Sequence, residues 1–225
     1  MTSSALDFSA VSKRYRDVPA LVDVSLAVQP GEFFGIVGEN GAGKTTLIKC
    51  LLDFCEIDGG EIRIFGVSHR KTTARAGVAY LPERFVPPFY ATGRDFLCYM
   101  MSLYRNPYDK ARVEEVFAGL DLDIRALDRL ARGYSKGMLQ KLALAACLLS
   151  GKALYVLDEP ASGLDPKARA LLKRQLQSLR DLGKTVFFAS HALVDVYELC
   201  DRMAVLHCGR VRYAGTPRGL IGDRR

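Results

Sequence analysis

Short apolar runs and longer stretches of helical spacing follow one another along this chain. Apolar runs bounded by glycines or polar residues predict buried strands at 33–37, 153–157, 185–189 and 203–206. A run that alternates polar and apolar residues predicts a half-exposed strand at 61–65. The first third of the chain is therefore expected to consist of strands and turns, and strand signals return in the last third.

Helical spacing of apolar residues predicts helices over 45–54, 109–120, 138–149 and 167–182. Strands that alternate with helices indicate a parallel sheet with helices on both faces. The stretch 83–150 differs from this pattern, because it carries helical spacing and little strand signal. Pro82, Pro87 and Pro88 lie at its entry. We therefore expect a helical insertion within the main domain.

The composition is that of an ordinary globular protein. The chain has 225 residues, 49% hydrophobic and 25% charged, enough for one large α/β domain with a sizeable core. The longest apolar run, 142–149, is far shorter than the roughly 20 residues that a membrane-spanning helix needs. The first residues carry neither a basic region nor an apolar signal core. We expect the protein to be made and kept in the cytosol.

The basic charge of the chain does not by itself identify a partner. The net charge is +7 and the sequence pI is near 9.1, with Lys and Arg spread along the chain apart from short groups at 69–71 and 223–225. This distribution favours a solvated surface and is compatible with a position at a membrane surface. No nucleic-acid partner is expected.

The six cysteines form no Cys-x-x-Cys pair, and most lie in apolar segments. We expect reduced core thiols, with a metal site as the alternative. The cysteines are Cys50, Cys55, Cys98, Cys147, Cys200 and Cys208.

A glycine-rich loop between a predicted strand and a predicted helix carries the pattern G-x-x-x-x-G-K-T. It consists of Gly38, Glu39, Asn40, Gly41, Ala42, Gly43, Lys44 and Thr45, and Thr46 follows. Glycines allow the backbone to wrap a phosphate, and the helix N-terminus favours its negative charge. Lys44 is expected to reach the β- and γ-phosphates and the Thr45 hydroxyl to hold Mg²⁺. The loop alone predicts a nucleoside triphosphate site without choosing among kinases, GTPases and motors.

Two adjacent carboxylates end the predicted strand at 153–157. An acidic residue at the carboxyl end of a parallel strand lies beside the ligand crevice, and side chains alternate along a strand. We therefore assign Asp158 to Mg²⁺, through bound water, and Glu159, as a catalytic residue, to positioning and polarising the hydrolytic water. His191, at the end of another predicted strand, is a candidate for sensing the γ-phosphate. His69 and His207 lack that context and receive no role.

Together these residues resemble the ATP-binding cassette (ABC) family. Residues 38–45 are similar to its Walker A loop, and 155–159 to its Walker B strand with the catalytic glutamate. Residues 134–138, Tyr-Ser-Lys-Gly-Met, resemble a variant of its Leu-Ser-Gly-Gly-Gln signature. Residues 162–165 resemble its D-loop, and 190–191 its H-loop. The five motifs occur in the family's order, and the resemblance extends over nearly the whole chain.

The resemblance implies an α/β fold: a P-loop NTPase (RecA-like) core with an N-terminal antiparallel β subdomain and an inserted α-helical subdomain. It implies a single ATP-binding domain over 1–225. We expect 1–82 and 151–225 to form the core and the β subdomain, and 83–150 to form the helical subdomain.

The signature has the parts of a second anion site. The Ser135 hydroxyl and the Gly137 amide precede a predicted helix, whose N-terminus favours an anion. The resemblance implies that two subunits pair head to tail, so that Ser135, Gly137 and Asp165 complete the ATP site of the partner. It also implies ATP and Mg²⁺ as cofactors, Tyr15 stacked on adenine, and Glu83 as a ligand of Mg²⁺.

Three residues depart from the usual family pattern. Lys136 replaces a signature glycine, Met138 replaces the signature glutamine, and Glu83 replaces the glutamine of the Q-loop. Glutamate can still bind Mg²⁺ or water but adds a negative charge. Both the signature variant and the Q-loop variant resemble exporter-type subfamilies, which favours export over import.

The resemblance implies an ATP-hydrolysing subunit that drives transport, with separate integral membrane permease subunits as partners and a homodimer expected. The protein would then be cytoplasmic and peripheral on the inner face of the cell membrane. The aromatic residues Phe85, Phe89 and Tyr90 are expected to be exposed and are candidates for contact with the permease; the alternative is that they pack within their own loop. A soluble ABC ATPase acting on ribosomes or DNA, and a small-molecule kinase, are the alternative functions; the cargo is not predicted.

Overall fold

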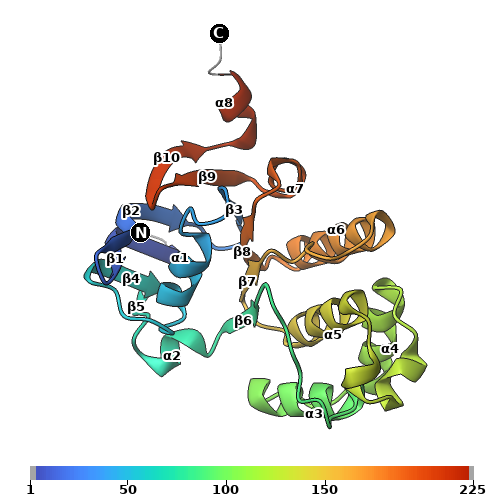
Figure 1. Ribbon diagram of the computed structural model, residues 1–225. Coiled ribbons are helices and arrows are strands. Elements are labelled where there is room, and N and C mark those ends of the chain that lie inside the picture. The colour runs from blue at the N-terminus through green and yellow to red at the C-terminus, as the bar shows by residue number, and fades with distance from the viewer. Residues whose placement is uncertain (1–3, 223–225) are drawn as a thin grey trace.

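The computed structural model describes residues 4–222 and all their side chains except that of Ile221. Its centre is a six-stranded sheet of order β10-β9-β3-β8-β7-β6, in which β10 alone runs antiparallel to its neighbour (Figure 1). The strands are β3 (Phe33–Val37), β6 (Val78–Leu81), β7 (Leu154–Asp158), β8 (Thr185–Ser190), β9 (Arg202–His207) and β10 (Arg210–Gly215).

A second, antiparallel sheet of order β2-β1-β4-β5 lies beside the first, and α1 lies between them (Figure 1). Its strands are β1 (Leu6–Tyr15), β2 (Val18–Val28), β4 (Gly59–Ile64) and β5 (Val67–Ser68). Helix α1 spans Lys44–Leu51 and directly follows the glycine-rich loop. The expected parallel core and N-terminal antiparallel sheet are both present.

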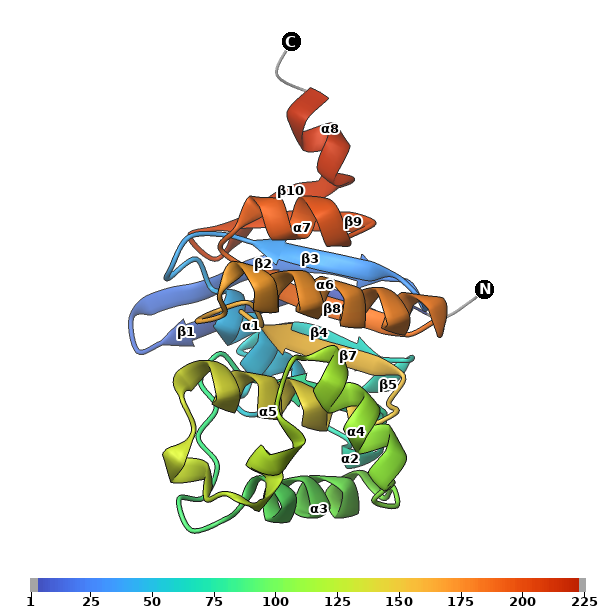
Figure 2. The same cartoon turned by 90° about the vertical axis from the view of Figure 1, so that its right-hand side faces the viewer.

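Of the remaining helices, α5, α6 and α7 lie on the opposite face of the six-stranded sheet, α3 and α4 pack on α5, α2 lies beside β5 and α8 lies beyond β10 (Figures 1 and 2). They are α2 (Thr72–Arg75), α3 (Gly93–Tyr104), α4 (Lys110–Gly119), α5 (Lys136–Leu149), α6 (Pro166–Asp181), α7 (Leu193–Leu199) and α8 (Pro217–Gly222). Two short 3-10 helices, η1 (Ile124–Asp128) and η2 (Ala131–Gly133), connect α4 to α5. Within the described residues, no helix is long and apolar enough to cross a membrane.

Alternating side chains of the central strands serve two separate cores. On β3, Phe34 and Ile36 pack with α1 and the antiparallel sheet. Phe33 and Val37 point the other way and pack with the helices. Because both faces are covered, all five residues of β3 are buried, which explains why its sequence is a continuous apolar run.

The predicted elements agree with the observed ones to within about two residues, except at the end of α1. That helix was expected to reach 54 but ends at Leu51, because Asp53 takes a left-handed φ of 62°. The sequence analysis named no helix at 93–104. Helix α3 is started there by a reciprocal cap, in which Thr92 and Asp95 each accept from the other's backbone N–H.

The expectation that the cysteines are core thiols is wrong for two of the six. Cys50 and Cys147 are buried and Cys55 and Cys200 are half-buried, but Cys98 and Cys208 are exposed. Cys98 lies on the outward face of α3, and Cys208 lies in the turn between β9 and β10. All six are free thiols.

Candidate functional site

The glycine-rich loop wraps between the end of β3 and the start of α1, and two of its glycines are sterically required. A Cβ at Gly38 would lie 2.4 Å from the Leu206 carbonyl oxygen. Gly43 has a φ of 109°, and a Cβ there would lie 2.7 Å from the Ala20 carbonyl oxygen. The loop is therefore held tightly against β9 and β2, with the N-terminus of α1 at its end.

The ammonium group of Lys44 lies within this loop. The side chain is buried, and Nζ donates to the Gly38 carbonyl at 2.7 Å and to the Glu39 carbonyl at 3.2 Å. Nζ also lies 3.5 Å from Oε1 of Glu159. The ammonium group of Lys44 thus connects the glycine-rich loop to the carboxylate that follows β7.

Asp158 ends β7 with only 1% of its surface exposed, and neither carboxylate oxygen has a hydrogen-bond partner among the described residues. Burial raises the pKa of Asp158 to about 6; the charges of Glu83 and Glu159 add to the increase, while the Thr45 hydroxyl and Lys44 oppose it. A buried carboxylate without a partner, next to a hydroxyl, fits a site for a divalent cation.

The described residues contain no cluster of three or more His, Cys, Asp or Glu that could hold a metal on its own. Mg²⁺ is usually bound by one or two protein oxygens together with substrate phosphates and water. The donor set of Asp158 and Thr45 therefore fits a cation that arrives with a nucleotide.

Glu159 takes a backbone conformation that is uncommon for a residue with a side chain, with a φ of 49°. Its N–H donates to the Ala189 carbonyl at 2.9 Å. Its Oε2 lies 2.8 Å from Nδ1 of His191, so the two carboxylate oxygens face a histidine and a lysine. The left-handed conformation separates the direction of Glu159 from that of Asp158, which allows the two acids different tasks.

Lys44, Glu159 and His191 open into one cavity of about 520 Å³, a size typical of ligand sites, whereas Asp158 is not among its lining residues. It is lined by Tyr15, Ala20, Glu39, Asn40, Gly41, Gly43, Lys44, Thr45, Thr46, Glu83, Glu159, Ser162 and His191. The structure thus brings Tyr15 and Glu83 to the phosphate loop, as expected. Sequence reasoning missed Ala20, because only the packing of the two sheets places β2 beside the loop.

Ser135, Gly137 and Asp165 lie elsewhere. They line a second cavity of about 380 Å³ that shares no lining residue with the first. Ser135 caps α5 by accepting from the Met138 N–H at 3.2 Å, and Asp165 caps α6 by accepting from the Ala168 N–H at 2.8 Å. Within one chain, therefore, Ser135 and Gly137 of the signature do not line the cavity at the glycine-rich loop.

One residue that the sequence analysis did not single out joins α5, the helix capped by Ser135, to the segment that follows β7. The buried side chain of Gln140, on α5, donates from Nε2 to the Pro160 carbonyl at 3.1 Å. Pro160 directly follows Glu159. In the sequence, only the position of Gln140, five residues after Ser135 on the first turns of α5, could have indicated that it lies near this site.

The loop before α3 carries exposed apolar side chains, but not all of those expected. Phe89 and Tyr90 are 69% and 71% exposed, and Val86 is more exposed still. Phe85 was expected to be exposed and is not, because its ring packs on Phe96 at a centroid distance of 4.8 Å. The exposed group is therefore Val86, Phe89 and Tyr90.

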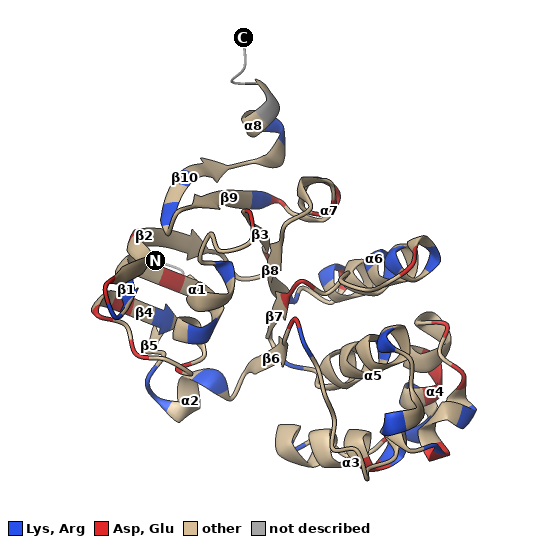
Figure 3. Cartoon of the chain, viewed as in Figure 1, with Lys and Arg blue, Asp and Glu red and all other residues tan. Residues whose placement is uncertain are grey.

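Lys and Arg are interspersed with Asp and Glu over the described residues (Figure 3). Many are paired on the surface, such as Lys167 with Asp121 at 2.7 Å and Arg180 with Asp201 at 2.6 Å. This arrangement agrees with the solvated surface predicted from the sequence.

Comparison with known proteins matches residues 21–162 to the family model described as ABC transporter. An uncharacterized ABC transporter ATP-binding protein of Synechocystis is 39% identical over 95% of this chain and 63% of its own length. The Nod factor export ATP-binding protein I of Rhizobium etli is 36% identical over 99% of this chain and 72% of its own length. The chain thus spans about two thirds of the length of these relatives.

Solved structures confirm the expected fold. An ATP-binding subunit of an ABC transporter superposes with a TM-score of 0.88 at 31% identity, over 98% of this chain and 95% of the other. A dimeric ATP-binding cassette in a post-hydrolysis state, bound to ADP and Pi, gives a TM-score of 0.85 at 22% identity, over 95% of this chain and 99% of the other. The second likeness concerns the fold alone.

Proposed function

Because this chain belongs to the ABC transporter family of ATP-binding subunits, we propose that it binds and hydrolyses ATP to drive transport through separate membrane permease subunits. One observation carries the proposal: Lys44 and Glu159 meet at one cavity beside the glycine-rich loop, and the buried, unpartnered Asp158 directly precedes Glu159. A cation for phosphates, a base for water and a cation-binding carboxylate are the parts that phosphate-chain hydrolysis needs.

The chain's own residues divide the work as follows. The loop amides and Lys44 hold the β- and γ-phosphates, and the half-exposed ring of Tyr15 stacks on adenine. Thr45 and Asp158, with Glu83 nearby, would hold Mg²⁺, which would neutralise phosphate charge. Glu159 orients a water and accepts its proton, while His191 fixes the direction of the Glu159 carboxylate through its 2.8 Å contact.

We further propose that two copies pair head to tail. The support is the separation of the two cavities. Ser135, Gly137 and Asp165 lie at the capped starts of α5 and α6, in a cavity that does not include the glycine-rich loop of the same chain. A helix N-terminus with a serine hydroxyl binds phosphate oxygens well. In the pair, each signature would close over the γ-phosphate held by the partner's Lys44.

Export is the direction that we propose. Lys136, Met138 and Glu83 resemble exporter-type variants, and the Rhizobium etli relative is named for Nod factor export. The permease would hold the protein at the inner face of the cell membrane and would select the cargo. Residues 83–150 would act as the helical subdomain that passes motion to it, through the exposed Phe89 and Tyr90.

The central test is Glu159→Gln, with Glu114→Gln on the exposed face of α4 as the matched control. Glu159→Gln should retain ATP binding and lower kcat by at least about 100-fold, because it removes the base. It should also form a stable dimer with ATP, measured by sedimentation. Turnover at the wild-type rate in Glu159→Gln would contradict the assigned role.

Cross-subunit geometry is tested by mixing two inactive variants, Lys44→Ala and Ser135→Ala. In a head-to-tail pair made of one copy of each variant, both defects fall in one ATP site and the other ATP site is intact. Random mixing should then restore roughly a quarter of the wild-type sites. If each subunit used its own signature, no mixture would regain activity.

The transport function has its own test. ATPase activity stimulated by RNA or DNA, with no binding of the protein to a permease, would overturn the transport function.

A further inference from the structure

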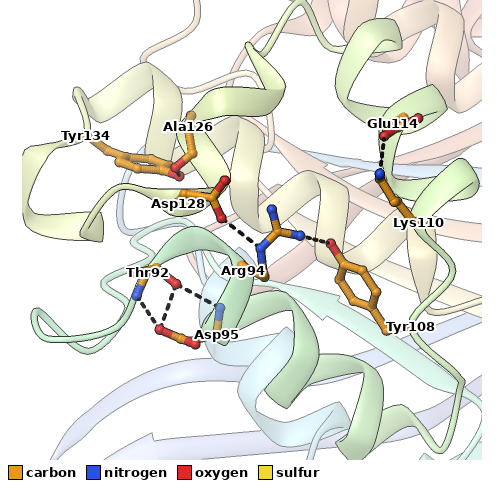
Figure 4. Close-up of polar contacts among 9 residues, drawn as sticks. All are labelled: Thr92, Arg94, Asp95, Tyr108, Lys110, Glu114, Ala126, Asp128 and Tyr134. Carbon is orange, nitrogen blue, oxygen red and sulfur yellow. Dashed lines mark hydrogen bonds and ion pairs between the residues drawn. The ribbon is translucent and has the colours of Figure 1, made fainter.

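Tyr134 directly precedes the signature serine, Ser135, and its side chain is held in place by its hydroxyl group. The side chain is buried, and its hydroxyl donates to the Ala126 carbonyl in η1 (Figure 4). Burial raises the pKa of Tyr134, so the hydroxyl keeps its proton and remains a donor at neutral pH. The backbone that enters Ser135 is thus fixed by a hydrogen bond in a dry environment.

The same hydroxyl lies against the first residue of α3. A Cβ at Gly93 would lie 2.3 Å from the Tyr134 hydroxyl oxygen, so only glycine leaves room for the phenol. Gly93 is not in a left-handed conformation, so its lack of a side chain serves this close approach. Tyr134 therefore contacts both η1 and the start of α3.

The start of α3 is in turn joined to the loop that carries Phe89 and Tyr90. The Ala131 N–H donates to the Ala91 carbonyl at 2.9 Å, and the Gly93 N–H donates to the Arg129 carbonyl at 3.3 Å. Residues 92 and 130 form an isolated antiparallel bridge. A displacement of the exposed loop would therefore reach 126–134 through backbone contacts.

We propose that Tyr134 is a positioning residue for Ser135: its hydroxyl, held between the Ala126 carbonyl and Gly93, fixes the signature relative to the start of α3. The inference rests on the proposed function, because Ser135 is taken to complete the partner's ATP site. Tyr134 itself contacts no nucleotide; it sets where Ser135 stands when two subunits close.

The nearby Tyr108 offers a matched control. Its hydroxyl accepts from Nη1 of Arg94 at 3.2 Å, and Arg94 also pairs with the exposed Asp128 at 2.8 Å (Figure 4). The substitution Tyr108→Phe therefore also removes one hydroxyl contact from the same group of helices. Its contact partner is a flexible surface side chain rather than the backbone beside Ser135.

The first experiment compares Tyr134→Phe with Tyr108→Phe. Tyr134→Phe should leave the affinity of the single subunit for ATP within about twofold, since the phosphate loop is intact. It should lower kcat and weaken ATP-dependent pairing in the Glu159→Gln background by roughly five- to tenfold, because a buried carbonyl loses its donor. Tyr108→Phe should change neither by more than about twofold.

The second experiment tests the contact itself and remains informative if Tyr134→Phe folds poorly. Gly93→Ala alone should lower kcat, because its Cβ displaces the phenol. In the double variant Gly93→Ala/Tyr134→Phe the clashing oxygen is gone, and the next ring atom lies 3.3 Å from the new Cβ. The losses of the two single variants should therefore not multiply: the double variant should be no worse than the more damaged of the two single variants by more than about twofold.

Three results would overturn the inference: wild-type kcat in Tyr134→Phe, equal losses in both tyrosine variants, or a double variant whose loss is the full product of the two single losses. A wild-type protein that neither binds nor hydrolyses ATP would refute the proposed function instead, so the two failures are distinguishable.

Discussion

Replacing Asp158 with asparagine should make the nucleotide-free protein more stable relative to wild type as pH rises from 5 to 7.5. The carboxylate is 1% exposed and has no hydrogen-bond partner among the described residues. Its pKa is about 6 in the folded protein, against an ordinary value of 3.8. That difference corresponds to about 3 kcal/mol of lost stability once the group is ionised in both states.

The sign follows from proton binding. Between pH 4 and 6 the folded protein holds a proton on Asp158 that the unfolded chain has released, so stability falls as pH rises through this window. Well above pH 6 the full free-energy cost of burying the ionised carboxylate of Asp158 is present. The amide introduced by Asp158→Asn would carry no charge at any pH, and its burial without a partner would cost the same throughout. The difference between the two proteins therefore isolates the carboxylate.

The assay is urea unfolding of wild type and Asp158→Asn without nucleotide, at pH 5.0 and pH 7.5. The stability of the variant relative to wild type should increase by about 1.4 kcal/mol between the two values. The exposed Asp17→Asn is the control and should show no such change. A constant difference between wild type and Asp158→Asn across this range would refute the account of Asp158.

The same variant tests the metal assignment. If the missing partner of Asp158 is Mg²⁺ held with ATP, adding Mg²⁺ to ATP should raise the wild-type melting temperature beyond the effect of ATP in EDTA. Asp158→Asn should lose most of that additional rise. An equal Mg²⁺ effect in both proteins would remove Asp158 from the cation site.

Two further predictions concern the phosphate loop. Lys44→Ala should weaken ATP binding by at least about tenfold, because charge-assisted contacts to phosphate are lost; equilibrium binding of a fluorescent ATP analogue measures it, with the exposed Lys49→Ala on the same helix as control, and unchanged affinity would refute the loop assignment. Gly38→Ala should cost about 1–3 kcal/mol of stability, because its Cβ would lie 2.4 Å from the Leu206 carbonyl oxygen. Gly77→Ala, where a Cβ meets nothing within 4 Å, should be close to neutral in the same unfolding assay, and equal effects at the two glycines would contradict the steric argument.

Local sequence was sufficient wherever one element carries the whole signal. The strand at 33–37 is apolar on both faces because both faces are buried, so its bounds were predicted correctly. The glycine-rich loop places Lys44 and Thr45 next to the phosphate site by covalent connection alone. Asp158 and Glu159 could be assigned to the same crevice because parallel strands end at the same edge of a sheet.

Contacts between distant segments were beyond the reach of a single sequence. The half-burial of Phe85 depends on Phe96, and the exposure of Cys98 depends on the direction of α3, which local apolarity does not specify. Gln140 and Ala20 carry no local signal, since a hydrogen bond to Pro160 and the packing of β2 define them.

The sequence by itself determined the order of the elements and predicted the chemistry proposed for this protein, namely which side chains would hold a triphosphate, a cation and a water. Only the tertiary structure decided which of those groups meet. It buried Asp158 without a partner, turned Glu159 toward Lys44 and His191, and set Ser135 apart from the phosphate loop. Composition and spacing express local preference, whereas burial and distance arise from packing between segments far apart in the chain.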